Sequence, residues 1–269
     1  MHATIFALLA AVNVTRDVAY AADVVDGKHR LDVYSPAGVR AAPVLVFIHG
    51  GGFVQGDRRD YNGLATAIAS TGIVVIVPSY RLFPQADARG AATDVAAAVA
   101  WTVKHVSAFG GNPRGVVLSG HSAGAYLAAL VGLAPTFLSA YGVPPRAIRG
   151  IAGFSGIYDV GDIDPAATPS DRELLQHYFG ETQEARSTLS PITYAAKTAP
   201  PMALYCGGVY DAVACGQRDL MFAALVHAGA DVQMDADASA THSDVVANLA
   251  RSGTPEQRAL LEFIEKYAH

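Results

Sequence analysis

The chain is poor in charge, cysteine and tryptophan: 16% of its 269 residues are charged, two are cysteine and one is tryptophan. Lys and Arg number 19 against 24 Asp and Glu, so the formal net charge is -5 at pH 7. Because nucleic-acid binding needs clustered positive charge and no basic stripe is present, we expect no nucleic-acid partner. No apolar segment reaches the roughly 18 residues of a membrane-spanning helix, so we expect no membrane span.

The two cysteines, Cys206 and Cys215, limit which metal sites and disulfides the chain could form. They lie nine positions apart across the end of a predicted strand. No CxxC motif or Cys/His cluster has the spacing of a zinc site, so we expect no metal, and no motif indicates a cofactor. Free thiols are the expected state of the pair, with a disulfide as the alternative.

The N-terminal stretch "MHATIFALLAAV", followed by "AYAA", has some features of a signal peptide. However, its apolar run is short and no Lys or Arg precedes it. In addition, "VTRDVAY" at residues 14–20 alternates like a first strand, which cleavage would remove. We therefore expect a cytoplasmic protein, with secretion as the alternative if this segment is a signal.

Strands and helices alternate along the chain. Near-continuous apolar runs at residues 43–50, 72–80 and 115–120 predict strands that are buried on both faces. Further strands are predicted at 14–20, 29–34, 147–155, 201–208 and 231–236, and helices at 62–70, 89–106, 123–133, 171–179, 216–230 and 254–267. This order predicts an α/β fold with a mostly parallel eight-stranded sheet and helices on both faces. We expect one domain over residues 1–269, with a loop and helix insertion at about 157–190 near the ligand-binding edge of the sheet.

Ser122 follows a buried strand and precedes a predicted helix, in the pattern G-x-S-x-G ("GHSAG", residues 120–124). Such a turn is so sharp that side chains two residues either side of the serine would collide, which explains the glycines. The turn would expose the Ser122 hydroxyl as a nucleophile beside the Ala123 amide at the helix N-terminus. The alternative is a glycine-rich turn whose serine only caps the helix. We expect His121 to have a structural role, because the turn should direct it away from Ser122.

A second glycine-rich stretch, "FIHGGGFVQGD", follows the first buried strand. Acyl transfer forms an oxyanion that needs N–H donors, and glycine amides can approach it without obstruction. We therefore predict that Gly51 and Gly52 form an oxyanion hole together with Ala123. A flexible glycine loop is the alternative.

A serine nucleophile also needs a histidine base and a carboxylate to orient that base. Of the nine histidines, His242 is the candidate, because it follows the last strand at the sheet edge that carries Ser122. Asp211 follows the preceding strand and gives the chain order Ser, Asp, His. Asp235 and Asp237, which flank the last strand, are the alternatives for the acid.

These motifs together resemble those of the α/β-hydrolase-fold serine esterases. The resemblance is to the group that includes hormone-sensitive-lipase-like enzymes, enzymes classed as feruloyl esterases and kynurenine-formamidase-like enzymes. It rests on "RLDVYSP", "VFIHGGGFVQGD", "PSYRLFPQ", "FGGNP", "LSGHSAGAYLAAL" and "SGIYD", and covers nearly the whole chain after Val14. It implies the α/β-hydrolase fold, with Ser122, Asp211 and His242 as the catalytic triad. The stretches "YCGGVYDAVACG" and "MDADASATH" depart from the group's usual pattern around the acid and the base.

The residues and the resemblance together predict a serine carboxylic ester hydrolase that acts on small or short-acyl esters through an acyl-enzyme. Phe53, Tyr126 and Tyr158 are the candidate substrate-binding residues. The alternatives are an arylformamidase that hydrolyses N-formylkynurenine-type formamides, and a catalytically silent binding protein with the same fold. A small-molecule ester is the expected partner, and a homodimer is left open.

Overall fold

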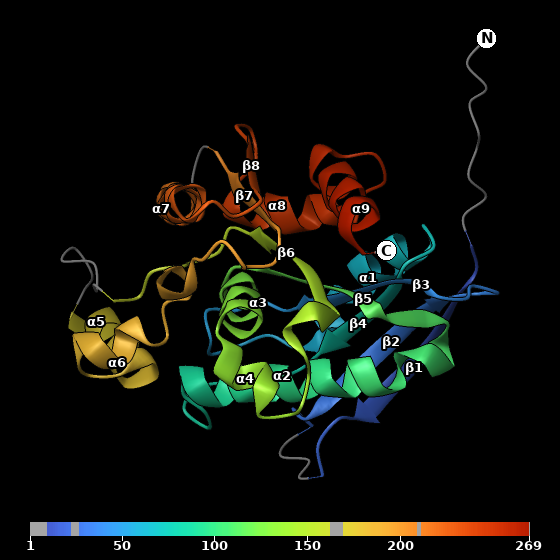
Figure 1. The fold of residues 1–269 in the computed structure, drawn as a ribbon, viewed down its shortest axis with the longest axis horizontal. Helices are drawn as coiled ribbons and strands as arrows, with labels where there is room; N and C mark the ends of the chain where they lie inside the picture. The colour runs from blue at the N-terminus through green and yellow to red at the C-terminus, as the bar shows by residue number, and fades with distance from the viewer. Residues whose placement is uncertain (1–9, 23–26, 162–168, 209–210, 269) are drawn as a thin grey trace.

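The computed structural model describes residues 10–22, 27–161, 169–208 and 211–268. Its strands form one eight-stranded sheet in the order β1-β2-β4-β3-β5-β6-β7-β8. The strands are β1 (Val12–Ala19), β2 (Arg30–Pro36), β3 (Ala42–Ile48), β4 (Val74–Pro78), β5 (Gly111–His121), β6 (Ile148–Phe154), β7 (Met202–Gly207) and β8 (Val232–Asp237). The strands from β3 to β8 pair in parallel, whereas β2 is antiparallel to both β1 and β4 (Figure 1). The mostly parallel eight-stranded sheet is therefore confirmed, and the strands predicted at 14–20 and 29–34 correspond to the antiparallel pair β1 and β2.

The central strands are apolar on both faces because each face packs against a separate layer of helices. Along β3, Val44, Val46 and Ile48 belong to one hydrophobic cluster, and the alternate residues Leu45 and Phe47 belong to the other. All five are fully buried. This alternation explains why the sequence of a parallel strand is a continuous apolar run.

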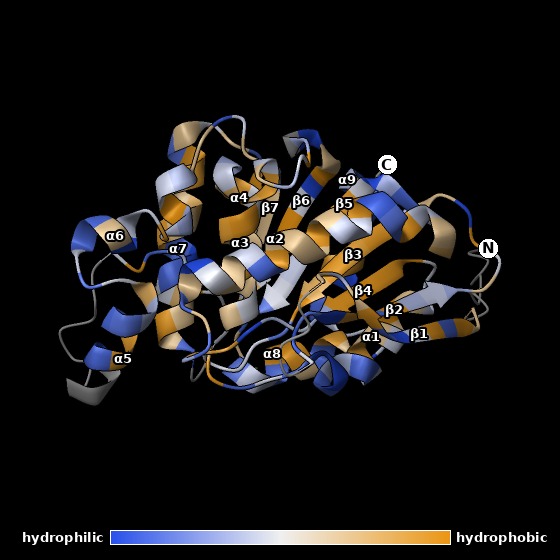
Figure 2. Cartoon of the chain, turned by 90° about the horizontal axis from the view of Figure 1, so that it is seen from below, coloured by the Kyte–Doolittle hydropathy of each residue, from blue (hydrophilic) through white to orange (hydrophobic). Residues whose placement is uncertain are grey.

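The two helix layers differ in their members. The helices are α1 (Asn62–Ala69), α2 (Ala88–His105), α3 (Ala123–Leu133), α4 (Pro135–Ser139), α5 (Pro169–Phe179), α6 (Gln183–Ser187), α7 (Ala212–Ala228), α8 (His242–Leu249) and α9 (Pro255–Tyr267). Buried residues of α2, α3, α4 and α7 pack on one face of the sheet, and those of α1, α8 and α9 pack on the other. Figure 2 shows the hydrophobic strands enclosed between these layers.

Several predictions from the sequence need correction or remain untested. The short helices α4 and α6 and the helix α8, which begins at His242, were not predicted. The predicted insertion at 157–190 contains α5 and α6, and its residues 162–168 lie outside the described residues, as do residues 1–9 of the signal-like segment. Within the described ranges, no helix is long and apolar enough to cross a membrane.

The expectation of free thiols is wrong in this structure, because Cys206 and Cys215 form a disulfide with a Cα–Cα distance of 5.3 Å. Cys206 lies near the end of β7, and Cys215 lies in the first turn of α7. The connection between the two elements is short, so this turn stays close to the end of the strand. The bond therefore spans the segment that carries Asp211.

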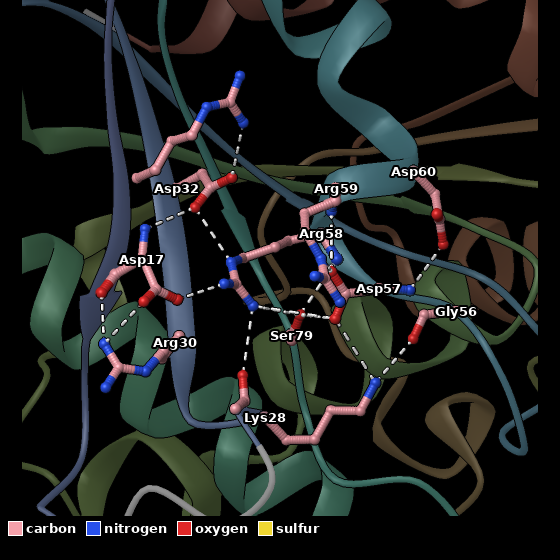
Figure 3. A network of polar contacts seen from close by, with 12 residues as sticks. Asp17, Lys28, Arg30, Asp32, Gly56, Asp57, Arg58, Arg59, Asp60 and Ser79 are labelled. Carbon is pink, nitrogen blue, oxygen red and sulfur yellow. Dashed lines mark hydrogen bonds and ion pairs between the residues drawn. The ribbon is translucent and has the colours of Figure 1, made fainter.

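A network of ion pairs joins the N-terminal hairpin to the segment that follows the glycine-rich loop (Figure 3). Asp32 is almost fully buried and accepts hydrogen bonds from Arg58 Nε at 3.0 Å and Arg16 Nη1 at 3.2 Å. Arg58 also pairs with Asp17, and Lys28 Nζ donates to the carbonyl oxygen of Gly56 at 2.9 Å. Because each buried charge has a partner, the network holds the C-terminal part of the glycine-rich loop against the sheet.

Candidate active site

Ser122 lies at the turn between β5 and α3, with φ 56° and ψ −121°. This left-handed conformation is rare for a residue with a side chain, and its strain is typical of a nucleophile elbow. The two flanking residues must be glycine, because a Cβ atom at either position would clash with the backbone. A Cβ on Gly120 would lie 2.4 Å from the Gly124 carbonyl carbon, and one on Gly124 would lie 2.0 Å from the Ile48 carbonyl oxygen. The steric argument for the G-x-S-x-G pattern therefore applies to this turn.

The glycine-rich loop follows β3 at the same edge of the sheet. Gly51, Gly52 and Phe53 all have positive φ, of 124°, 57° and 69°. A Cβ on Gly51 would lie 2.0 Å from the Gln55 carbonyl oxygen, whereas one on Gly52 would meet nothing within 4 Å. The loop closes on itself because the Val54 and Gln55 amides both donate to the Gly51 carbonyl oxygen.

Three amides near Ser122 remain available to a ligand. The Gly50 amide donates to the Tyr61 hydroxyl at 2.9 Å. Within the described ranges, by contrast, the amides of Gly51, Gly52 and Ala123 donate no hydrogen bond to the protein. Ala123 is the first residue of α3, so its amide lies at the positive end of that helix. An anionic oxygen near Ser122 could accept hydrogen bonds from such donors.

Asp211 and His242 meet directly. His242 Nδ1 lies 2.7 Å from Asp211 Oδ1, although 31 residues separate the two in sequence. Asp211 is buried at the N-terminus of α7, whereas 40% of the His242 side chain is exposed. When the carboxylate accepts a hydrogen bond from Nδ1–H, Nε2 of the neutral imidazole carries no proton and can act as a base.

His242 owes its position to the start of α8. Thr241 is the N-cap, and its hydroxyl and the Asp244 carboxylate form a reciprocal capping box. The box sets where the helix begins, so His242 becomes its first residue. Asp235 and Asp237, the alternatives for the acid, instead accept hydrogen bonds from nearby residues of their own segment, Ala236 and Ser239.

His121 links the nucleophile elbow to the His242 segment. It is 6% exposed, and its Nε2 donates to the carbonyl oxygen of His242 at 2.8 Å. The centroids of the two imidazole rings are 4.6 Å apart. The residue that precedes Ser122 therefore holds the backbone of the candidate base beside the elbow, which is the structural role expected of His121.

The Ser122 hydroxyl itself has no hydrogen-bond partner among the described residues, so it makes no direct bond to His242 here. Hydrogen bonds between a nucleophile and its base are often long or poorly aligned in ligand-free sites and tighten when substrate binds. The structure thus joins Asp211 to His242 and brings the His242 ring to the elbow.

Burial keeps two histidines at this edge uncharged. Desolvation lowers the pKa of His49 from 6.5 to about 4. The pKa of His121 also falls from 6.5 to about 4, first through burial and then through the charge of His242. His49 Nδ1 lies 2.8 Å from the Gly50 carbonyl oxygen, and its ring stacks on Tyr80. Both rings must stay neutral in the folded protein.

These two histidines predict acid-sensitive stability. In the unfolded chain the imidazoles of His49 and His121 bind protons below about pH 6.5. In the folded chain the same rings stay unprotonated down to about pH 4. The free energy of unfolding should therefore fall as the pH decreases through this window, by about 2 kcal/mol per histidine at pH 5. Urea unfolding at pH 7.5 and pH 5 measures this change. His49→Gln should reduce the difference between the two pH values, and an equal difference in the variant would contradict the assignment.

The candidate substrate-binding residues Phe53, Tyr126 and Tyr158 are buried, with exposed fractions of 7%, 0% and 0%. Phe53 stacks on Tyr178 of α5 at a centroid distance of 4.5 Å and makes edge contacts with Tyr126 and Phe179. The Tyr126 hydroxyl donates to the Leu189 carbonyl oxygen. In this structure these aromatic side chains fasten the insertion to the glycine-rich loop. Their contact with a substrate stays a prediction.

An open cavity of about 520 Å³ lies on the other side of the glycine-rich loop. Its wall is formed by Gly50, Gly51, Gln55, Gly56, Asp60, Tyr61, Gly63, Leu64, Val246, Ala247 and Ala250. The loop therefore separates a closed aromatic side from an open side that borders α8.

Sequence reasoning did not single out two partners of Asp211, namely Ser155 and Gly207. The Ser155 hydroxyl and the Gly207 amide both donate to Asp211 Oδ2. The available signal is positional, because Ser155 is the last residue of the strand predicted at 147–155, at the sheet edge that carries Ser122 and Asp211.

Comparison with known proteins identifies the family. The model of the BD-FAE family matches residues 31–225, which is most of the chain and includes Ser122 and Asp211. The chain belongs to the BD-FAE family. Within this BD-FAE chain, the match ends inside α7 and so stops before His242.

Relatives of this BD-FAE protein include named esterases. Isoprenylcysteine alpha-carbonyl methylesterase ICME of Arabidopsis thaliana is 28% identical over 236 residues, which cover 81% of this chain and 54% of the relative. The probable carboxylic ester hydrolase LipM of Mycobacterium tuberculosis is 28% identical over 206 residues, covering 71% of this chain and 48% of the relative. The chain therefore spans about half the length of these curated relatives.

Solved structures show the same fold. Esterase B from Lactobacillus rhamnosis, in an inhibited form, superposes with a TM-score of 0.78 at 22% identity, over 95% of this chain and 88% of that one. A truncated carbohydrate esterase from gut microbiota superposes with a TM-score of 0.80 at 17% identity, over 96% of each chain. The BD-FAE chain thus has the α/β-hydrolase fold, as the sequence predicted.

Proposed function

We propose that this protein is a serine carboxylic ester hydrolase that acts on small or short-acyl esters through an acyl-enzyme intermediate. The observation that carries the proposal is the 2.7 Å contact between Asp211 and His242, made beside the strained turn that exposes Ser122. A carboxylate-bound histidine whose second nitrogen is free serves to take a proton from a nucleophile. Ser122 is the hydroxyl at this edge that the fold exposes for attack.

The proposed reaction has two steps. Ser122 Oγ attacks the ester carbonyl carbon while His242 Nε2 takes its proton, and Asp211 stabilises the imidazolium. The oxyanion accepts hydrogen bonds from the amides of Gly51, Gly52 and Ala123. His242 then returns the proton to the departing alcohol, and the C–O bond breaks to leave the acyl group on Ser122. Water, deprotonated by the same histidine, releases the acid and restores the serine.

The relatives support the reaction class. ICME is named as a methylesterase and LipM as a probable carboxylic ester hydrolase. Neither of these relatives is named as a formamidase, so the arylformamidase alternative keeps only the sequence resemblance that suggested it. The available donors, the candidate nucleophile and the Asp211–His242 pair argue against a silent binding protein.

The closed side of the glycine-rich loop favours a short acyl group over a long one. Phe53, Tyr126, Tyr178 and Phe179 pack together there with exposed fractions of 7% or less. A long acyl chain would have to displace this cluster. We infer that Phe53 and Tyr126 limit the acyl length.

A substrate panel tests this function. Initial rates are measured on p-nitrophenyl acetate, butyrate and decanoate and on N-formylkynurenine, and the protein is labelled with a fluorophosphonate. We expect the acetate or butyrate ester to be the best substrate and the label to map to the peptide that contains Ser122. Faster turnover of N-formylkynurenine would favour the formamidase, and the absence of both labelling and turnover would favour the binding protein.

Assembly and compartment stay predictions. Gel filtration with light scattering would test the homodimer.

The disulfide between Cys206 and Cys215 bears on the cellular compartment. Disulfides persist in oxidising compartments, which favours secretion over the cytoplasmic location expected from the sequence.

A further inference from the structure

Ser155 repeats the backbone geometry of Ser122 one strand further along the sheet. It directly follows β6 and has φ 50°, compared with 56° for Ser122 after β5. The Ser122 amide donates to the Phe154 carbonyl oxygen at 2.8 Å, and the Ser155 amide donates to the Tyr205 carbonyl oxygen at the same distance. Neighbouring strands thus each end in a serine in the left-handed region. Ser155 differs in being 1% exposed, which excludes it as a nucleophile for a solvent-borne substrate.

The Ser155 side chain points at the candidate acid. Its hydroxyl donates to Asp211 Oδ2 at 2.5 Å, and the Gly207 amide donates to the same oxygen at 3.0 Å. The other oxygen, Oδ1, faces His242 Nδ1 at 2.7 Å. The carboxylate thus accepts hydrogen bonds from three donors, two at Oδ2 and one at Oδ1.

It matters that the two carboxylate oxygens have different partners, because the bond between the Asp211 Cβ atom and its carboxyl group rotates easily. The last side-chain torsion of aspartate is broad and nearly two-fold, so covalent geometry does not fix the plane of the carboxylate. Asp211 is buried at 5% exposure, so bulk water can do little to replace a lost donor. The plane is therefore set by the hydrogen bonds to Oδ2, and this plane determines whether Oδ1 faces His242.

We propose that Ser155 is a positioning residue, which acts through Asp211 to hold the His242 imidazole in the orientation and tautomer that proton transfer from Ser122 requires. This inference rests on the proposed esterase function. The left-handed backbone of Ser155 is consistent with the role. A glycine would adopt this conformation without strain, whereas the serine found here adds a hydroxyl that donates to the acid.

The test compares Ser155→Ala and Ser155→Gly with Ser119→Ala. Ser119 is a matched control, because it is fully buried on the adjacent strand β5 and its hydroxyl has no partner among the described residues. Loss of a hydrogen bond to a charged group predicts that either Ser155 variant lowers kcat on p-nitrophenyl butyrate by about 10- to 100-fold. KM should change less than about twofold, since substrate contacts remain. Ser119→Ala should leave both constants near the wild-type values.

The glycine variant keeps the experiment decisive if alanine disturbs folding, because glycine relieves the backbone strain while also removing the hydroxyl. Thermal unfolding measured alongside separates loss of fold from loss of rate. A folded Ser155→Gly protein whose kcat matches that of Ser119→Ala would overturn the proposal.

A double-variant cycle with Asp211→Asn separates positioning from general packing. If Ser155 acts through the carboxylate, Ser155→Ala should lower kcat by less than about threefold in the Asp211→Asn background. A full additional 10- to 100-fold loss would show that Ser155 acts elsewhere and would overturn the proposal. If Asp211→Asn alone leaves kcat unchanged, the triad itself is wrong. In that case the proposed function fails with the inference, a result distinct from failure at Ser155 alone.

Discussion

Ser122→Ala is expected to lower kcat on short-chain p-nitrophenyl esters by about 10⁵- to 10⁶-fold, the scale of loss when a serine hydrolase loses its nucleophile. The residual rate would come from the oxyanion donors and from water activated by His242. Because the Ser122 hydroxyl bonds to no described residue, its removal should leave the thermal unfolding midpoint almost unchanged. Steady-state rates and a thermal melt of the purified variant measure both effects.

His242→Ala is the matched comparison for Ser122→Ala. The two residues act as one unit, so the double variant should be no slower than either single variant within a few-fold. A Ser122→Ala protein that keeps more than about 1% of the wild-type kcat, with contamination excluded, would contradict the role given to this serine. Another group would then be the nucleophile.

Gly124→Ala is expected to disrupt the elbow. The new Cβ would lie 2.0 Å from the Ile48 carbonyl oxygen and 2.6 Å from that of His49, and neither backbone atom can yield as a flexible side chain would. Helix α3 would have to move away from β3, which displaces Ser122 and the Ala123 amide together. We expect a loss of several kcal/mol in the free energy of unfolding and at least about 100-fold in kcat, since such displacements are costly.

Gly63→Ala controls for the change of residue type. Gly63 is the second residue of α1, as Gly124 is of α3, and a Cβ on it would meet nothing within 4 Å. Alanine favours a helix over glycine by up to about 1 kcal/mol, so this variant should unfold no more easily than the wild type. Because the new Cβ meets no atom, the variant should also keep full activity. Urea unfolding and kcat measured on both variants make the comparison. A Gly124→Ala protein as active as Gly63→Ala would refute the steric argument.

The succession of strands along the chain and the sheet edge that carries the candidate site were predictable, because both follow from short-range patterns. Continuous apolar runs marked the buried strands, and the carboxyl ends of parallel strands meet at one edge, so Ser122, Asp211 and His242 could be placed there together. The need for glycine at position 120 was also predictable, because its crowding by Gly124 arises within a single turn. Gly124, by contrast, is crowded by the carbonyl oxygens of Ile48 and His49, which are distant in sequence.

Contacts between distant segments were not predictable in the same way. The bond from Ser155 to Asp211 joins residues 56 positions apart, and the one from His121 to His242 joins residues 121 positions apart. Neither serine nor histidine carries a local signal of such a partner. Phe53 and Tyr126 illustrate the same limit, because an aromatic residue near a site has the same sequence signature whether it faces a ligand or packs under a helix.

The disulfide gives Asp211 a second attachment to the sheet. Helix ends fray, and the first turn of α7 would normally open and close in solution, carrying its N-cap residue with it. Here the chain from Cys206 to Cys215 forms a covalent ring, so the opened turn stays tethered to the end of β7 and the acid can travel only as far as the ring allows. The ring therefore limits how far the Asp211 carboxylate can move away from the end of β7.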